Sequence, residues 1–209
     1  MTGAPTRTPR AHVTEARIVA EALRLIRDEP AGKFTLARLA KRLGISTPSL
    51  YSHVPSKQYI IERVRSSVVS QIDDSVFETL PWDRALVAWG ESYAEAFARH
   101  PETIHLLATH SVQAPELIRQ YERAAAALLA AGWPEDQIMH AITAVESLVL
   151  GSVLDMVAPP QMVQPGDGDF PLLHALVDEL PPEPDRAKRS FVFGLEALVA
   201  GFAERLANQ

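Results

Sequence analysis

Three short hydroxyl side chains that lie close together in the sequence are the clearest candidates for recognition chemistry. They are Thr47, Ser49 and Ser52, and hydroxyls of this kind bind the edges of bases in the major groove of DNA. Their spacing turns all three outward from a helix whose inner side carries Leu50. The segment is therefore predicted to read a base sequence.

Groups that bind phosphate surround these hydroxyls. Tyr51, His53 and Lys57 can each donate a hydrogen bond to a phosphate oxygen. A helix predicted to begin after Ser56 adds the positive end of its dipole beside them. Since base contacts select a sequence and phosphate contacts set the register, the two sets together predict a DNA-binding surface.

Three predicted helices position this surface. Apolar residues at helical spacing predict the first over residues 13–27. Thr35 is the expected N-cap of a second helix over 36–43, which Gly44 ends, and the third covers Pro48–His53. Helix, glycine turn and helix is the order of a helix-turn-helix, whose second helix enters the major groove.

Charge separates this end of the chain from the rest. The whole chain of 209 residues has a net charge of −6, which by itself disfavours binding to DNA. Residues 1–65, however, hold 12 Lys or Arg and 5 Asp or Glu, a net charge of +7, whereas residues 66–209 hold 8 and 21, a net charge of −13. A basic module joined to an acidic body is typical of a nucleic-acid-binding protein. We therefore expect a DNA-binding domain over 1–60, with a flexible arm over 1–12, and a second domain over 61–209.

The rest of the chain keeps helical spacing, with Pro and Gly between the segments and no alternation typical of a strand. The further predicted helices cover residues 57–77, 82–99, 102–110, 115–131, 135–157, 172–179 and 185–206. The predicted fold class is all-α, with an N-terminal three-helix helix-turn-helix domain and a C-terminal helical domain for ligand binding and dimerisation.

The segment FTLARLAKRLGISTPSLYSHVPSK, residues 34–57, resembles the DNA-binding helix-turn-helix of the TetR family of transcriptional regulators. The Leu50–Tyr51 pair, the imidazole two residues later and the Lys after a short polar turn carry the resemblance. The resemblance implies DNA contacts by Thr35, Thr47, Pro48, Ser49, Tyr51, His53 and Lys57. An arginine that reads a base in the family falls on Ala37 here, with Arg38 beside it as the candidate contact, so the resemblance implies a different operator sequence.

The segment GWPEDQIMHAITAVESLVLGSVLD, residues 132–155, resembles the tetracycline repressors of that family, so the match spans most of the chain. The resemblance implies a ligand-responsive transcriptional regulator that acts as a repressor. It would bind a palindromic operator as a homodimer and be released by a small-molecule effector. Two alternatives stay open: a helical small-molecule carrier with no DNA-binding role, and a DNA-binding activator.

Small residues gather on one face of two predicted helices. They are Ala141, Ala144, Gly151 and Ser152 in one helix and Gly194, Ala197, Ala200 and Gly201 in the other. The resemblance implies that this pair of helices packs against its copy in a second subunit, and an intramolecular core is the alternative. A two-fold dimer presents two reading helices about one DNA turn apart, roughly 34–36 Å.

Aromatic and polar residues at helical spacing indicate an effector pocket, because a small-molecule site is an apolar cavity with a few polar anchors. The candidate lining residues are Trp89, Tyr93, Phe97, His105, Thr109, Met139, Thr143 and Ser147. Ordinary core packing produces the same pattern. Relative to the tetracycline repressors, Trp89 and Ala124 replace amide side chains, so the resemblance implies a small aromatic or apolar effector.

Neither a metal site nor a catalytic site is expected. By the resemblance, His105 and Asp155 are the only candidates for metal ligands, and two such residues make a weak site for a hard cation. The chain has no cysteine, and it contains no GxSxG, P-loop, GxGxxG or HExxH motif. We therefore expect no cofactor and no enzyme activity.

The expected location follows from two absences in the sequence. No apolar run approaches the roughly 18 residues of a membrane span, and the N-terminal residues include no hydrophobic signal region. We therefore expect a cytoplasmic protein without a membrane partner. Its expected partners are double-stranded operator DNA, the effector and a second copy of the chain.

Overall fold

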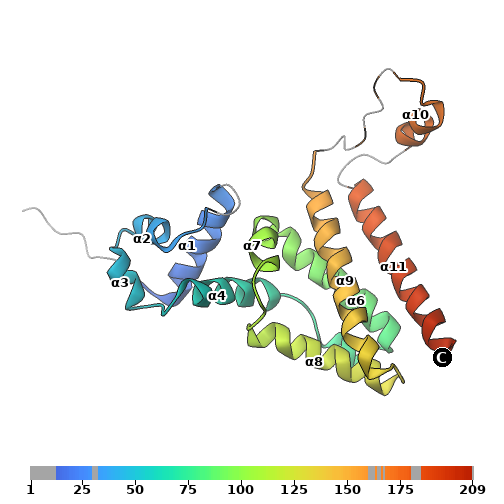
Figure 1. Cartoon of the computed structure of the whole chain (residues 1–209), viewed down its shortest axis with the longest axis horizontal. Helices are drawn as coiled ribbons and strands as arrows, with labels where there is room; N and C mark the ends of the chain where they lie inside the picture. Colours follow the sequence, from blue (N-terminus) through green and yellow to red (C-terminus); the bar gives the residue numbers. More distant parts are fainter. Residues whose placement is uncertain are drawn as a thin grey trace, which may run out of the picture. The chain divides into compact units, whose positions relative to one another are not determined.

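The computed structural model describes residues 13–29, 33–159, 163, 166, 168–179 and 185–208. The described residues form helices and connecting turns without any strand, which confirms the predicted all-α fold class (Figure 1). The chain divides into two compact units after Val64. We describe each unit by itself.

The N-terminal unit contains three helices and the start of a fourth: α1 (Glu15–Asp28), α2 (Leu36–Leu43), α3 (Thr47–Tyr51) and α4 (Lys57–Val69). A hydroxyl caps each of the first three by accepting a hydrogen bond from a backbone N–H; these caps are Thr14, Thr35 and Ser46. Gly44 ends α2 with a φ of 72°, in the left-handed region that favours glycine. The turn between α2 and α3 is thus set by local chemistry.

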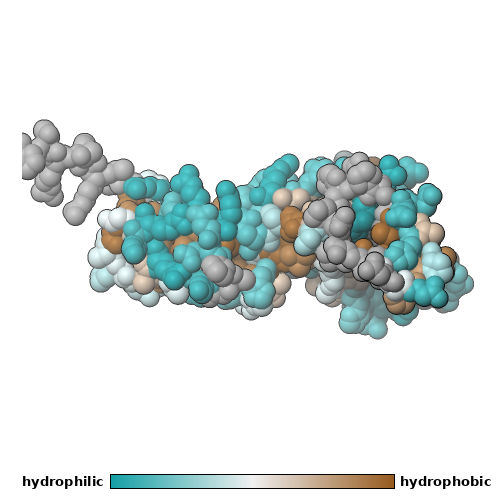
Figure 2. All heavy atoms as spheres, turned by 90° about the horizontal axis from the view of Figure 1, so that it is seen from above, coloured by the Kyte–Doolittle hydropathy of each residue, from teal (hydrophilic) through white to brown (hydrophobic). Residues whose placement is uncertain are grey.

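An apolar core joins these helices. The residues at its centre are Ile18, Ala22, Leu25, Leu39, Leu50, Val54 and Ile60, each at most 1% exposed. Because α3 is short, its position depends on the burial of Leu50 against this core. The face of this unit that Figure 2 shows is largely hydrophilic.

The C-terminal unit contains the end of α4 and most of the chain's helices. They are α5 (Val76–Thr79), α6 (Trp82–Ala98), the 3₁₀ turn η1 (Pro101–Thr103), α7 (Ile104–Ala108), α8 (Pro115–Ala130), α9 (Glu135–Met156), α10 (Pro171–Asp178) and α11 (Asp185–Ala207). Among these, α9 packs against α6, α8 and α11, and α6 also packs against α11. The core of the unit therefore lies around α6 and α9.

The helix predicted over 57–77 ends at Val69, so the prediction was wrong about its second part. The amide of Gln71 donates a hydrogen bond to the backbone carbonyl of Ser67 at 3.1 Å. Oδ1 of Asp73 then accepts from the backbone N–H two residues later at 3.0 Å. Polar side chains that bond to nearby backbone in this way offer it an alternative to the helix.

One helix bears on the expectation that the chain has no membrane-spanning segment. By length and composition alone, α9 is apolar enough to cross a membrane, yet it packs against three other helices of its unit. Only 33% of its most apolar window is buried within the described chain. Most of its exposed residues are polar or small, and Met139 and Leu154 are the large apolar side chains that it exposes.

Candidate functional site

The first candidate site is the outer side of α3. Leu50 is completely buried under this helix, and Tyr51 is 53% exposed. The predicted contacts on and beside α3 are either exposed, as are Pro48, Tyr51 and His53, or half-buried, as are Thr47 and Ser49. The structure thus gathers these five side chains on one short helix and the turn that follows it.

The beginning of α4 borders this surface. Ser56 caps the helix by accepting a hydrogen bond from the backbone N–H of Tyr59 at 3.0 Å. The ammonium of Lys57 is exposed and lies 5.7 Å from the centre of the Phe34 ring, within the range of a cation–π contact. The contact holds the long Lys57 side chain beside the start of its helix.

Two predicted contact residues at the start of α2 have structural partners. The hydroxyl of Thr35 accepts from the backbone N–H of Arg38 at 3.3 Å, as an N-cap does. The guanidinium of Arg38 forms an ion pair with Glu29. A phosphate contact by Arg38 would therefore have to replace a carboxylate that already faces it.

A second pair of interactions connects α1 to α4. The hydroxyl of Tyr59 donates to Glu15 at 2.8 Å, and Arg63 forms an ion pair with the same carboxylate at 2.5 Å. The hydrogen bond from Tyr59, together with the Arg63 charge, lowers the pKa of Glu15. These contacts fix the helix that carries Lys57 relative to α1.

The second candidate site is a cavity of about 290 Å³ within the C-terminal unit. Side chains from the end of α4 and from α6, α7, α8 and α9 line it. Its walls are mostly apolar and include Phe97, Ile104, Leu107, Leu117 and Leu150. An apolar cavity with few polar groups has the character of a small-molecule site.

Three polar side chains of the cavity form a cluster around a carboxylate, and Thr143, Ser147 and His110 line it separately. The hydroxyls of Tyr93 and Tyr121 donate to Oε1 of Glu146 at 3.1 and 2.7 Å. Burial raises the pKa of Glu146, while these hydrogen bonds and the charge of Arg65 act in the opposite direction. Burial and the nearby carboxylate raise the pKa of both tyrosines, so their hydroxyls keep their protons at neutral pH.

The remaining charged group of the cavity is Arg65, which is 5% exposed. One of its nitrogens, Nη2, donates to the backbone carbonyls of Leu107 at 3.1 Å and His110 at 3.0 Å. These carbonyls lie at and just beyond the end of α7, where backbone acceptors lack partners within the helix. Arg65 therefore ties the end of α4 to the end of α7.

The cavity includes four of the eight predicted pocket residues: Tyr93, Phe97, Thr143 and Ser147. Trp89 does not line it but is completely buried beside it, and its indole N–H donates to Gln120 at 3.2 Å. The other three, His105, Thr109 and Met139, are exposed and are not among the lining residues.

Sequence reasoning missed the polar cluster. Glu146 carried a usable signal, because it is the only acidic residue between Asp136 and Asp155 in a mostly apolar helix. A lone carboxylate at such a place is buried near other polar groups more often than it is left alone. Arg65 and Tyr121 had no comparable signal, because only the packing of different helices brings them to the cavity.

The two candidate metal ligands lie in different surroundings. His105 is exposed on α7, and the carboxylate of Asp155 accepts a hydrogen bond from Arg186 at 2.8 Å. In the part of the chain that the structure describes, three or more His, Asp or Glu side chains do not gather in a way that could hold a metal ion.

The small residues of α9 and α11 divide between two surfaces. Ala141 is buried inside the unit, and a Cβ on Gly194 would lie 3.4 Å from Leu148, so Gly194 lies at the contact of α9 with α11. Gly151 and Gly201 are exposed and have open space around them. Both helices therefore have an outer side on which another helix could approach closely.

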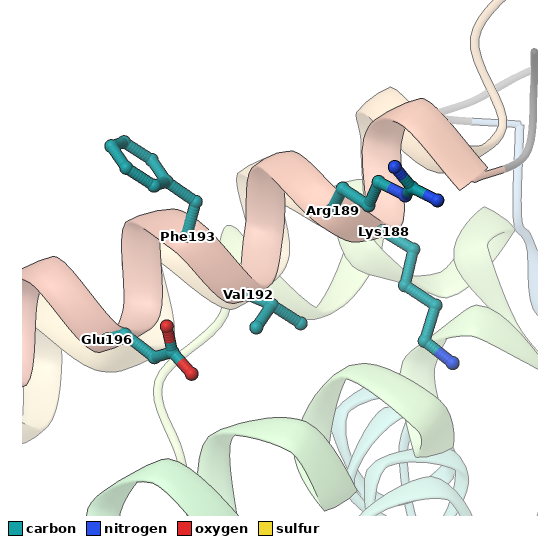
Figure 3. A pocket seen from close by; sticks show the side chains of 5 residues that line it. All are labelled: Lys188, Arg189, Val192, Phe193 and Glu196. Atoms are coloured by element: carbon teal, nitrogen blue, oxygen red, sulfur yellow. The ribbon is translucent and has the colours of Figure 1, made fainter. Parts of the chain in front are cut away.

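Large apolar side chains accompany these small residues. Met139 and Leu154 of α9 are 50% and 49% exposed, and Phe193 of α11 is 76% exposed. Phe193 points away from the side of α11 that carries Val192 (Figure 3), and both belong to a shallow depression along this helix. Phe193 therefore exposes most of its apolar ring to solvent in a single chain.

Models of known protein families match both units of the chain. A family model described as "Bacterial regulatory proteins, tetR family" matches residues 18–64, and one described as "Tetracyclin repressor-like, C-terminal domain" matches residues 78–206. The second model alone covers more than half of the chain.

Similar proteins include an HTH-type transcriptional regulator from Saccharopolyspora erythraea, 25% identical over 203 residues, with 91% of this chain and 85% of that protein covered. A class E tetracycline repressor protein from Escherichia coli is 24% identical over 200 residues, with 90% of each chain covered. Among solved structures, the TetR family protein ActR of Streptomyces coelicolor in complex with actinorhodin has a TM-score of 0.70 at 21% identity, with 94% of this chain and 99% of that chain covered.

Proposed function

Because the chain belongs to the TetR family of transcriptional regulators, we propose that it is a ligand-responsive repressor that binds a palindromic operator as a homodimer. Proteins of this family are non-enzymatic regulators that bind DNA and small molecules and act as dimers. They are typically ligand-responsive repressors. With DNA as its target, the protein acts in the cytoplasm.

The observation that carries the proposal is the arrangement of α2 and α3. A glycine turn holds the two helices, Leu50 anchors α3 in the core, and the polar side chains of α3 remain outside. This geometry suits a reading helix in the major groove. The proposed contacts to DNA are Thr35, Arg38, Thr47, Pro48, Ser49, Tyr51, His53 and Lys57.

The outer sides of α9 and α11 support the proposed homodimer. Only a third of the apolar window of α9 is buried, and Phe193 of α11 is 76% exposed. A four-helix contact between two copies would cover both features, and the open space at Gly151 and Gly201 permits close packing there. Two-fold symmetry then presents two copies of α3 to a palindromic site.

The cavity supports control by a small-molecule effector. Its walls include Arg65 near the end of α4, and the same helix begins with Lys57 at the proposed DNA surface. An effector that displaces the end of α7 acts on Arg65 through its hydrogen bonds to Leu107 and His110. Release from DNA then requires different effector affinities of the free and DNA-bound proteins, a coupling of about 1–3 kcal/mol in typical cases.

Selection from a pool of random-sequence duplexes, followed by footprinting, tests the DNA-binding part of the proposal. We expect saturable binding at low salt and a protected site with two symmetrical halves about one DNA turn apart. Failure to enrich any duplex would favour a helical carrier without a DNA-binding role. Placing the selected site over a reporter promoter separates repression, in which the protein lowers transcription, from activation.

A further inference from the structure

The cluster around Glu146 leaves one of its oxygens available. Tyr93 and Tyr121 both donate to Oε1, and Oε2 has no hydrogen-bond partner among the residues that the structure describes. Oε2 and both phenol oxygens therefore have lone pairs that can still accept a hydrogen bond, whereas the two tyrosine hydroxyls occupy both lone pairs of Oε1. The phenol protons are already engaged, so the cluster offers acceptors and no free donor.

The charge of this cluster is not neutralised by direct contact. Within the described chain, no Lys, Arg or His side chain forms an ion pair with Glu146. Arg65 acts on it only through its charge at longer range, while its Nη2 donates to two backbone carbonyls. Glu146 is half-buried, so its unpaired charge carries part of the cost of a buried carboxylate, and a cationic ligand would offset that cost.

The apolar walls limit the kind of molecule that can bring a positive charge into the cavity. The rings of Tyr93 and Phe97 stack at 5.0 Å between centroids and 7° between planes, which places two stacked aromatic rings in the lining of the cavity. The volume of about 290 Å³ lies at the lower end of the range for ligand pockets. These dimensions fit a small ligand of a few fused rings.

We propose that the cavity selects effectors in which a protonated amine is attached to a small aromatic framework, with the ammonium facing Glu146. An ammonium has three N–H donors and no acceptor, so it matches the free lone pairs of Glu146, Tyr93 and Tyr121. The framework lies beside the stacked rings of Tyr93 and Phe97. The inference rests on the proposed function, because it takes this cavity to be the effector site.

Three naphthalene derivatives of nearly equal size test the ligand class by isothermal titration calorimetry on the full chain at pH 7, without DNA. The probes are 2-naphthylmethylamine, 2-naphthalenemethanol and 2-naphthoate, whose polar groups are a cation, a neutral hydroxyl and an anion. We expect the amine to bind about tenfold or more tightly than the alcohol, since hydrogen bonds to a charged group are the stronger ones. The carboxylate should bind most weakly.

The substitution Glu146→Gln separates charge from shape. Glutamine keeps an oxygen that accepts from both tyrosines but lacks the negative charge, so the advantage of the amine over the alcohol should largely disappear. Glu122→Gln is the matched control, because Glu122 is exposed on α8 and its replacement changes the net charge equally. A second variant, Tyr121→Phe, should weaken binding of the amine more than that of the alcohol.

Three results would overturn the inference: tightest binding of 2-naphthoate, an amine advantage that survives Glu146→Gln, or no binding of the amine at millimolar concentration. The effect of the amine on DNA affinity is measured separately. If the amine binds through Glu146 without changing DNA affinity, the ligand class stands and effector-driven release in the proposed function fails. If another compound releases the DNA from outside this cavity, the ligand class fails and the repressor function stands.

Discussion

The replacement Phe193→Ala tests the proposed dimer surface. In a single chain the Phe193 ring is 76% exposed, so its full burial by a partner would remove about 150 Å² from water, taking roughly 200 Å² for the whole side chain. At about 25 cal/mol per Å² this corresponds to about 4 kcal/mol as an upper value. Ordering the side chain at an interface costs about 1 kcal/mol of that.

Two copies of the ring leave the interface when both subunits carry the substitution. The dimer dissociation constant should therefore rise by a factor between about 10² and 10⁴, with the upper figure corresponding to about 3 kcal/mol for each ring. Sedimentation equilibrium of the wild type and the variant over a range of concentrations measures this change directly. Operator binding should weaken in parallel, because a single helix-turn-helix reads only a half-site.

The matched control is Leu129→Ala, which removes a large apolar side chain that is 51% exposed and belongs to α8, outside the two helices of the proposed interface. It should leave the dissociation constant unchanged within about threefold, less than 1 kcal/mol. Equal dimer stability in the wild type and Phe193→Ala would refute the assignment of the interface to this side of α11. Equal weakening by Leu129→Ala would show that the effect is not specific to that side.

Three further predictions concern the reading surface, the turn after α2 and the carboxylate of Glu146. Lys57→Ala should weaken binding to all duplexes alike and flatten the salt dependence, whereas Ser49→Ala should change the preferred sequence; anisotropy titrations against the selected site and point-altered versions of it distinguish the two. Gly44→Ala should lower the free energy of unfolding by about 1 kcal/mol, because a side chain at a φ of 72° is strained although no atom lies within 4 Å of the added Cβ; Gly44→Asn should cost less, and equal denaturant midpoints for all three proteins would contradict the backbone argument. Burial raises the pKa of Glu146 above its usual 4.5, so protonation favours the folded state, and the resulting stability is fully present below pH 4.5 and lost as the pH rises through the folded-state pKa. Glu146→Gln should accordingly melt at a higher temperature than the wild type at pH 7 and at a similar temperature near pH 4, and a variant that is less stable at pH 7 would argue against this sign.

The N-terminal helices could be predicted from sequence because their signals are local. Thr35 caps α2 and Gly44 ends it through contacts within a few residues, and both features are recognisable from residue type alone. The end of α4 was harder to predict, because apolar residues continue at helical spacing beyond Val69. The polar side chains that follow it form their own turn, and spacing alone does not reveal which of the two patterns prevails.

The membership of the cavity could not be predicted from periodicity. Trp89 and Tyr93 are one helical turn apart on α6 and share a face, yet only Tyr93 lines the cavity. Gln120 accounts for this difference, since it accepts from the Trp89 indole at 3.2 Å and donates to the Val69 carbonyl at 2.8 Å. The interaction joins three helices that are distant in sequence, and nothing in the spacing along one helix indicates it.

The charge of the two sequence halves connects the proposed ligand class with DNA binding. Residues 66–209 have a net charge of −13, so this part of the chain repels a polyanion and leaves the basic residues 1–65 to bind it. The same negative field raises the local concentration of a small cation near the effector cavity and lowers that of an anion. A cationic effector thus reaches Glu146 with favourable steering, and salt should slow its association. An anionic effector would have to overcome this field and then face a carboxylate that has no directly paired cation. The net charge and the local geometry therefore both favour a cationic ligand.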